Sequence, residues 1–130
     1  MCGIAGILSV DPVSSDCVQR ALSACRHRGP DDGGLWSQSG FWASDEAPTG
    51  LPGCIWLGNR RLRILDLSPA ARQPMSNEDG SVWVTFNGEI VSFQELRAEL
   101  KAAGHRFRSH SDTEVIVHGY EQWGIECVNR

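Results

Sequence analysis

The pattern of apolar positions predicts a strand at the start of the chain. Residues 4–10 are apolar except for Gly6 and Ser9, which is typical of a buried strand. The glycines at positions 3 and 6 allow a neighbouring backbone to approach closely. Asp11-Pro12 follows the apolar run and predicts its end.

A helix is predicted from Asp16, because apolar residues then recur at i, i+3, i+4 and i+7. These positions are Val18, Ala21, Leu22 and Cys25. Gly29-Pro30 predicts the end of the helix. The charged, glycine-rich residues 26–34 are interpreted as a loop, either a solvated connection or a segment whose backbone approaches a ligand.

Two further helices are predicted from capping boxes in the second half of the chain. The first box is Ser92-Phe93-Gln94-Glu95, and the helix after it ends at Gly104. The second is Ser111-Asp112-Thr113-Glu114, and its helix ends at Gly124. Both helices have one apolar side and are expected to form part of the scaffold.

Alternating apolar residues predict extended segments between these helices. Residues 55–57 and 62–64 read as two segments separated by Gly58-Asn59, with Arg61 and Arg63 on the face opposite Leu62 and Ile64. Residues 82–86 form a third segment after a turn at 77–80, and residues 105–108 a short fourth one. Strands and helices in this mixture predict an α+β fold.

The composition excludes several classes of protein. Of the 130 residues, 41% are hydrophobic and 22% charged, which is ordinary for a globular domain and excludes a disordered chain. The net charge of −4 gives no reason to expect a nucleic-acid partner. Five cysteines without a C-x-x-C pair suggest neither a zinc knuckle nor a complete disulfide framework. No signal peptide, membrane span or nucleotide-binding loop is visible, so we expect a cytoplasmic protein.

Cys2 is the first candidate for chemistry. Once Met1 is removed, Cys2 carries both a thiol and a free α-amine, whose ordinary pKa values are about 8.5 and about 8. The amine can therefore accept the thiol proton near physiological pH, which suggests an N-terminal-nucleophile hydrolase. The alternative is a buried cysteine at the start of a strand, since free cysteine is among the most buried residue types.

Three other positions allow both a structural and a functional interpretation. Arg61 is either solvent-facing or aimed at a ligand's carboxylate. Asn87-Gly88 is either a turn or a pair of donors of the kind an oxyanion hole needs. Asp112 is either a favourable charge at a helix N-terminus or a ligand for an ammonium group.

Taken in order, the motifs resemble the class II glutamine amidotransferase domain. They are Met-Cys-Gly-Ile-Ala-Gly at 1–6, Arg-His-Arg-Gly-Pro-Asp at 26–31, Leu-Gly-Asn-Arg-Arg-Leu-Arg-Ile-Leu-Asp at 57–66, Gln-Pro-Met at 73–75, Phe-Asn-Gly-Glu-Ile at 86–90 and Ser-Asp-Thr-Glu at 111–114. Within that class, the motifs at 26–31 and 57–66 resemble glutamine-hydrolysing asparagine synthetases. The resemblance covers nearly the whole chain.

The resemblance implies a role for each candidate residue. It makes Cys2 the nucleophile that attacks the side-chain amide of L-glutamine, and Asn87 and Gly88 the oxyanion hole. Arg61 would hold the α-carboxylate of glutamine, while Glu89 and Asp112 would bind its α-ammonium group. A γ-glutamyl thioester would form with release of ammonia, and water would then hydrolyse it to glutamate. No metal is required.

The resemblance also implies a partner. In the family, ammonia passes to a synthetase domain in which ATP has adenylated aspartate, so ATP and Mg are expected only in that domain, in cis or in trans, and no cofactor is expected in this chain. The family fold is a four-layer αββα sandwich, which 130 residues leave incomplete at the C-terminus. Residues 1–130 are therefore interpreted as a truncated glutaminase domain, from a fragment or a truncated gene. A homodimer is compatible with the sequence.

Departures from the family pattern leave other readings open. Asn59 stands where the family usually has His, and Val91-Ser92 where it usually has Tyr-Asn. The alternatives are a non-catalytic glutamine-binding or docking module, a glutaminase that serves a different amide-forming synthetase, and an inactive remnant. The acceptor substrate is not specified by these residues.

Overall fold

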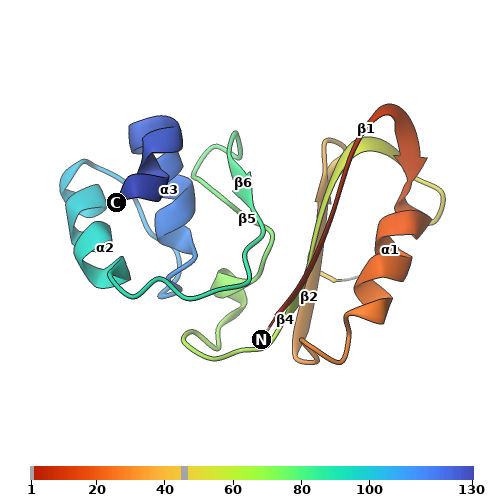
Figure 1. The fold of residues 1–130 in the computed structure, drawn as a ribbon, viewed down its shortest axis with the longest axis horizontal. Helices are drawn as coiled ribbons and strands as arrows, with labels where there is room; N and C mark the ends of the chain where they lie inside the picture. Colours follow the sequence, from red (N-terminus) through yellow and green to blue (C-terminus); the bar gives the residue numbers. More distant parts are fainter. Residues whose placement is uncertain (1, 45–46) are drawn as a thin grey trace. The chain divides into compact units, whose positions relative to one another are not determined.

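The computed structural model describes residues 2–44 and 47–130, and it divides into two compact units (Figure 1). Met1, whose removal the proposed chemistry needs, lies outside the described residues. The first unit comprises the described residues up to Arg63, together with Arg72–Pro74 and Thr85–Gly88. The second comprises Ile64–Ala71, Met75–Val84 and Glu89–Arg130. Each unit is described by itself.

The described residues of the first unit form a four-stranded antiparallel sheet in the order β1-β4-β2-β3. Its strands are β1 (Gly3–Ser14), β2 (Asp32–Ser37), β3 (Gly40–Trp42) and β4 (Pro52–Arg61). The pairing of β1 with β4 begins at Gly3 opposite Arg60, and its register shifts between Leu8 and Val13. β4 therefore joins the N-terminal strand to β2.

One helix, α1 (Ser15–Ala24), covers one face of this sheet and makes its core (Figure 1). Val18 and Leu22 of α1 are fully buried against Leu35 and Trp56 of the sheet. The Ser14 side chain caps the helix by accepting a hydrogen bond from the Asp16 N–H. The predicted helix and its Val18–Leu22 face are thus confirmed, although Ala21 is exposed.

The strands of the first unit differ from the prediction in three places. β1 continues through Asp11-Pro12, and Leu8 and Val10 are 84% and 97% exposed, because only alternate residues of β1 face α1. Gly58 and Asn59 lie inside the continuous strand β4, which ends at Arg61, so the second segment predicted at 62–64 is not a strand. A side-chain Cβ at Gly58 would lie 2.7 Å from Leu22, so this glycine makes room for α1 and breaks no strand.

The second unit contains two helices, α2 (Phe93–Ala102) and α3 (Glu114–Trp123), which contact each other (Figure 1). Leu100 of α2 and Val115 and Val117 of α3 are buried. The described residues also include a short antiparallel pair, β5 (Met75–Ser76) with β6 (Trp83–Val84), and the 3-10 helices Pro69–Ala71 and Gly124–Asn129.

The two capping boxes predict the helices correctly, but in the part of the chain that the structure describes the side-chain hydrogen bonds expected at the helix N-termini are not formed as predicted. Neither N-cap residue, Ser92 or Thr113, makes a side-chain capping hydrogen bond within the described chain. The Glu114 carboxylate instead accepts hydrogen bonds from the N–H groups of Arg108 and Ser109. Residues 105–108 form no regular secondary structure, so the strand predicted there is wrong.

Other features agree with the prediction. Gly104 and Gly124 have φ angles of 106° and 60°, which suit glycine at helix ends. An antiparallel sheet with separate helices confirms the α+β class. Among the described residues, none of the helices is both long and apolar enough to cross a membrane.

Candidate active site

Cys2 lies at the start of β1, beside the end of β4. Gly3 pairs with Arg60, so the next position of the register sets Cys2 opposite Arg61. Directly opposed residues of an antiparallel pair project to the same face of the sheet. The Cys2 Sγ accepts a hydrogen bond from the Leu62 N–H at 3.4 Å and lies 3.8 Å from the Leu62 carbonyl oxygen. The half-buried thiol therefore lies at the end of β4, and the register continued by one residue would set it on the same face as Arg61.

The segment 26–31 holds this end of the sheet in place. Arg28 Nε donates to the Cys2 carbonyl oxygen at 3.0 Å, and Arg60 Nε donates to the Gly29 carbonyl oxygen at 3.0 Å. A Cβ at Gly29 would lie 2.2 Å from the Arg60 carbonyl oxygen. Gly29 is thus needed because the protein's own backbone passes close by, a reason that neither interpretation of the loop, as a solvated connection or as a segment approaching a ligand, had included.

Asp32 is the centre of a group that we name the arginine cluster: Asp32, Arg61, Arg63 and Arg72. The Asp32 side chain is 6% exposed, and its carboxylate lies 2.8 Å from Arg72 Nε, 3.3 Å from Arg63 Nη2 and 3.9 Å from Arg61 Nη1. Asp32 opposes Arg61 directly in the β2–β4 pairing. The strand register therefore places the Arg61 side chain and the Asp32 carboxylate on the same face of the sheet, the face that α1 does not cover.

The arginine cluster carries an excess of positive charge. Three guanidinium groups surround one buried carboxylate, so cationic groups outnumber anionic groups within the cluster. A guanidinium binds a carboxylate through paired N–H donors, and a local cationic field attracts anions. The cluster is thus suited to a second carboxylate supplied by a ligand.

Thr85–Gly88 is fastened to β4 by buried amides. The Phe86 N–H donates to Gln73 Oε1 at 2.6 Å, and Asn59 Nδ2 donates to the same oxygen at 3.3 Å. Asn59 Nδ2 also lies 3.2 Å from Thr85 Oγ1, which donates to the Gly58 carbonyl oxygen at 3.2 Å. Asn59, where the family usually has His, therefore anchors the segment that leads to Asn87.

Asn87 and Gly88 end this anchored segment. Asn87 is half-buried and Gly88 is exposed. A Cβ at Gly88 would lie 2.5 Å from Phe86 Cζ, so a larger residue there would displace the Phe86 ring. The structure therefore places four of the six predicted residues, Cys2, Arg61, Asn87 and Gly88, in the first unit.

Glu89 and Asp112 lie in the second unit, where a hydrogen bond links their segments. Asp112 is 6% exposed, and its Oδ2 accepts from the Ile90 N–H at 3.0 Å. Its Oδ1 accepts from the Thr113 N–H at 2.9 Å. Glu89 itself is exposed. Asp112 thus does more than place a charge before a helix, because it holds the backbone next to Glu89.

Sequence reasoning missed Asp32 and Gln73 as parts of this arrangement. Asp32 stands in a stretch interpreted as a loop, but it begins β2, and only the β2–β4 register reveals that it faces Arg61. Gln73 belongs to the Gln-Pro-Met motif, and that motif is the feature of the sequence that could have identified it. Its side chain is buried and joins β4 to Phe86.

Comparison with known proteins gives matches over the whole chain. A model of the glutamine amidotransferase domain matches residues 1–130. Asparagine synthetase [glutamine-hydrolyzing] 1 of Arabidopsis thaliana is 39% identical over 133 residues, covering 99% of this chain and 20% of the relative. Asparagine synthetase [glutamine-hydrolyzing] 1 of Bacillus subtilis (strain 168) is 35% identical, covering 100% of this chain and 19% of the relative.

A similar match is found with asparagine synthetase [glutamine-hydrolyzing] 2 of Oryza sativa subsp. japonica, 41% identical over 132 residues and covering 99% of this chain. The chain thus spans about a fifth of the length of these relatives. The family model, by contrast, matches every residue from 1 to 130. The chain therefore belongs to the glutamine amidotransferase domain family.

Proposed function

We propose that this chain is the glutaminase part of an asparagine synthetase, which hydrolyses L-glutamine to glutamate and ammonia. The observation that carries the proposal is the position of the Cys2 thiol directly before β1, where its Sγ accepts a hydrogen bond from the Leu62 N–H just after β4. Removal of Met1 would give Cys2 a free α-amine next to that thiol. Nucleophile and base would then belong to one residue.

The proposed reaction has two steps, and neither of them changes an oxidation state. The α-amine takes the thiol proton, and the thiolate attacks the side-chain carbonyl carbon of glutamine. The C–N bond breaks, and the amine returns its proton to the leaving ammonia. Water then attacks the thioester carbon, the C–S bond breaks, and glutamate leaves with the thiol restored.

The other residues bind the parts of the substrate that do not react. The Asn87 amide and the Gly88 N–H are proposed to stabilise the oxyanion, and Arg61 to bind the α-carboxylate. The positive excess of the arginine cluster supports the latter role. Glu89 and Asp112 are proposed to bind the α-ammonium group. None of these steps uses a metal or a cofactor.

We further propose the family's four-layer sandwich and a synthetase partner. The exposed apolar side chains of Ile4, Leu8 and Val10 on the α1-free face support a second sheet packing there. Ammonia would then amidate aspartate in a synthetase domain, in cis or in trans, and ATP and Mg are assigned to that domain. The relatives' names, which specify both asparagine synthesis and glutamine hydrolysis, support this assignment.

The test is ammonia release from glutamine, with the N-terminal mass measured on the same sample. Loss of Met1 with activity abolished in Cys2→Ala is expected, together with a covalent adduct of a glutamine-like electrophile on Cys2. Cys17→Ser is the matched control, because this half-buried cysteine lies on α1. Activity that survives Cys2→Ala would overturn the proposal. Glutamine binding without an adduct would support the non-catalytic binding module instead.

A further inference from the structure

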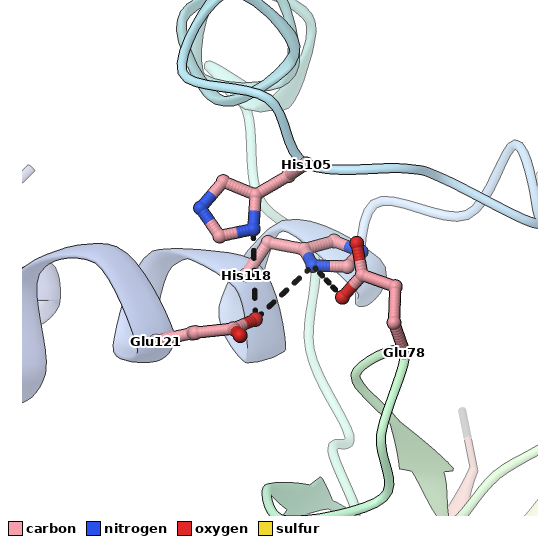
Figure 2. A group of neighbouring side chains, drawn as sticks. All are labelled: Glu78, His105, His118 and Glu121. Atoms are coloured by element: carbon pink, nitrogen blue, oxygen red, sulfur yellow. Dashed lines mark ion pairs between the residues drawn. The ribbon is translucent and has the colours of Figure 1, made fainter.

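Four side chains in the second unit converge around one point, and we name them the histidine cluster: Glu78, His105, His118 and Glu121 (Figure 2). They come from the turn between β5 and β6, the segment after α2, and α3. One nitrogen or oxygen from each lies within 4.8 Å of the others. The cluster thus draws together three segments that are distant in sequence.

His118 is the buried member of the histidine cluster. Its side chain is 1% exposed, and neither ring nitrogen has a hydrogen-bond partner among the described residues. Nδ1 points into the cluster, 3.4 Å from Glu78 Oε2 and 3.8 Å from Glu121 Oε2 (Figure 2). A buried ring nitrogen without a bond is costly unless a ligand satisfies it. Both the buried Nδ1, unpaired within the described chain, and the acidic groups around it are therefore features that a bound cation would explain.

The other nitrogen of His118 faces Glu114. Nε2 lies 3.6 Å from Glu114 Oε1, one turn earlier on α3. Glu114 is buried, and its carboxylate accepts hydrogen bonds from the Ser109 hydroxyl and from the N–H groups of Arg108 and Ser109. A metal-bound histidine commonly turns its second nitrogen toward such a carboxylate. Glu114 is placed to take that role if a metal ion occupies Nδ1.

His105 is oriented in the same way. Its Nε2 lies 3.0 Å from Gln122 Oε1, and because that oxygen can only accept, the ring nitrogen donates. A neutral His105 then keeps its lone pair on Nδ1, which faces Glu121 Oε2 at 3.5 Å (Figure 2). The Nδ1 atoms of both histidines therefore face the same point.

The two glutamates complete the arrangement. Glu78 Oε1 accepts from the Arg106 N–H at 2.8 Å, which leaves Oε2 toward His118. Glu78 and Glu121 are 37% and 38% exposed and line an open pocket beside His105, which gives an ion access from solvent. Two carboxylates that face one point concentrate negative charge there, and a cation would compensate that charge.

We propose that the histidine cluster binds one divalent transition-metal ion, with Zn²⁺ as the best fit, through Nδ1 of His105 and His118 and one oxygen each of Glu78 and Glu121. Two ligands at about 2.0–2.1 Å from a tetrahedral zinc lie about 3.3 Å apart. The distances of 3.4, 3.5 and 3.8 Å between cluster atoms are close to that spacing.

The donor set discriminates among metals. Imidazole nitrogen suits zinc and its neighbours, whereas Ca²⁺ requires six to eight oxygen ligands and Mg²⁺ a near-octahedral set of oxygens. An ion here would tie the β5–β6 turn to α3 and so stabilise the second unit. The site is independent of the proposed glutaminase chemistry, because none of its residues is assigned to glutamine.

The test is to titrate the metal-stripped 130-residue chain with ZnSO₄ under reducing conditions and to measure the heat of binding by calorimetry. One equivalent is expected to bind, and His105→Gln and Glu121→Gln are each expected to weaken binding by at least tenfold. The matched controls are His110→Gln and Glu95→Gln, because both of these side chains are exposed and outside the cluster. His118 is left intact, since replacing a buried ring could unfold the unit.

A second readout separates this site from the five cysteines. Cobalt bound in place of zinc is expected to show the visible bands of a tetrahedral ion without a sulfur-to-metal charge-transfer band. Zinc is also expected to raise the thermal midpoint of the parent chain but not of the His105→Gln/Glu121→Gln double variant. Absence of stoichiometric binding, or equal binding by the double variant, would overturn the proposal.

Discussion

The arginine cluster of the first unit and the histidine cluster of the second have opposite charge arrangements. In the first, three cations surround one buried carboxylate, and hydrogen bonds at 2.8 and 3.3 Å satisfy that carboxylate. In the second, two carboxylates surround ring nitrogens, and those of the buried His118 have no hydrogen-bond partner among the described residues. The two clusters therefore favour opposite classes of ligand, because cationic groups are in the majority in the arginine cluster and carboxylates face one point in the histidine cluster.

The largest effect is expected from breaking the arginine cluster at its centre. Asp32→Asn removes the negative charge that lies among the three guanidinium groups, and removing one partner of a buried ion pair costs about 3–5 kcal/mol. Denaturant unfolding would measure the loss against Asp11→Asn, in which the replaced carboxylate is exposed. Equal stability of the two variants would contradict the central role of Asp32.

A smaller loss is expected from Glu114→Gln in the second unit. The buried Glu114 carboxylate accepts from Arg108 N–H, Ser109 N–H and Ser109 Oγ, and an amide group would oppose some of these donors. Leaving a buried donor unsatisfied costs about 1–3 kcal/mol. Zinc affinity should also fall about 10- to 100-fold, because the His118 ring loses its charged neighbour. Unfolding and calorimetry, with the exposed Glu126→Gln as control, would measure both.

Arg61→Lys tests whether the arginine cluster binds the substrate carboxylate. Lysine keeps the charge but loses the paired donors, so KM for glutamine should rise about tenfold with little change in kcat. Steady-state ammonia release would measure this, with Arg20→Lys on the exposed side of α1 as the control. An unchanged KM for Arg61→Lys would remove Arg61 from the proposed site.

The smallest loss of stability is expected at an exposed ion pair, which gives a reference value for the losses expected in the buried clusters. Arg130 Nη1 lies 2.9 Å from Glu99 Oε1, but the two side chains are 46% and 52% exposed. Such pairs contribute about 0–1 kcal/mol because water and salt screen them. Arg130→Ala should therefore lower the unfolding free energy by less than about 1 kcal/mol. A loss as large as that of Asp32→Asn would show that burial does not explain the difference.

Local patterns predicted the helices better than the strands. The spacing of Val18 and Leu22 and the glycine stops at Gly104 and Gly124 are local signals, and the structure confirms the helices that they indicate. Gly58 misled the prediction because its role depends on Leu22, a residue 36 positions away. Strand boundaries depend on such distant partners, so a glycine alone does not distinguish a break from a close contact.

The candidate site was predictable where chemistry is carried by residue type and order. Cys2, Arg61 and Asn87-Gly88 could be named from motifs, and their roles stay predictions until activity is measured. Asp32 could not be named, since the β2–β4 register alone sets it opposite Arg61. The sequence identified Asn59 only as a departure from the family's usual His. Its anchoring role was not predictable, because its hydrogen bonds join it to Gln73 and Thr85 in other segments of the chain.

By itself, the sequence determined the family, the α+β class and the thiol at the head of the first strand, because each follows from residue order or local periodicity. The tertiary structure alone decided which charges meet. His105 and His118 stand 13 positions apart and Glu78 a further 27 before them, and only folding around α3 brings their ligand atoms together. Electrostatic interactions depend on distance in space, and that distance is set by packing and strand register.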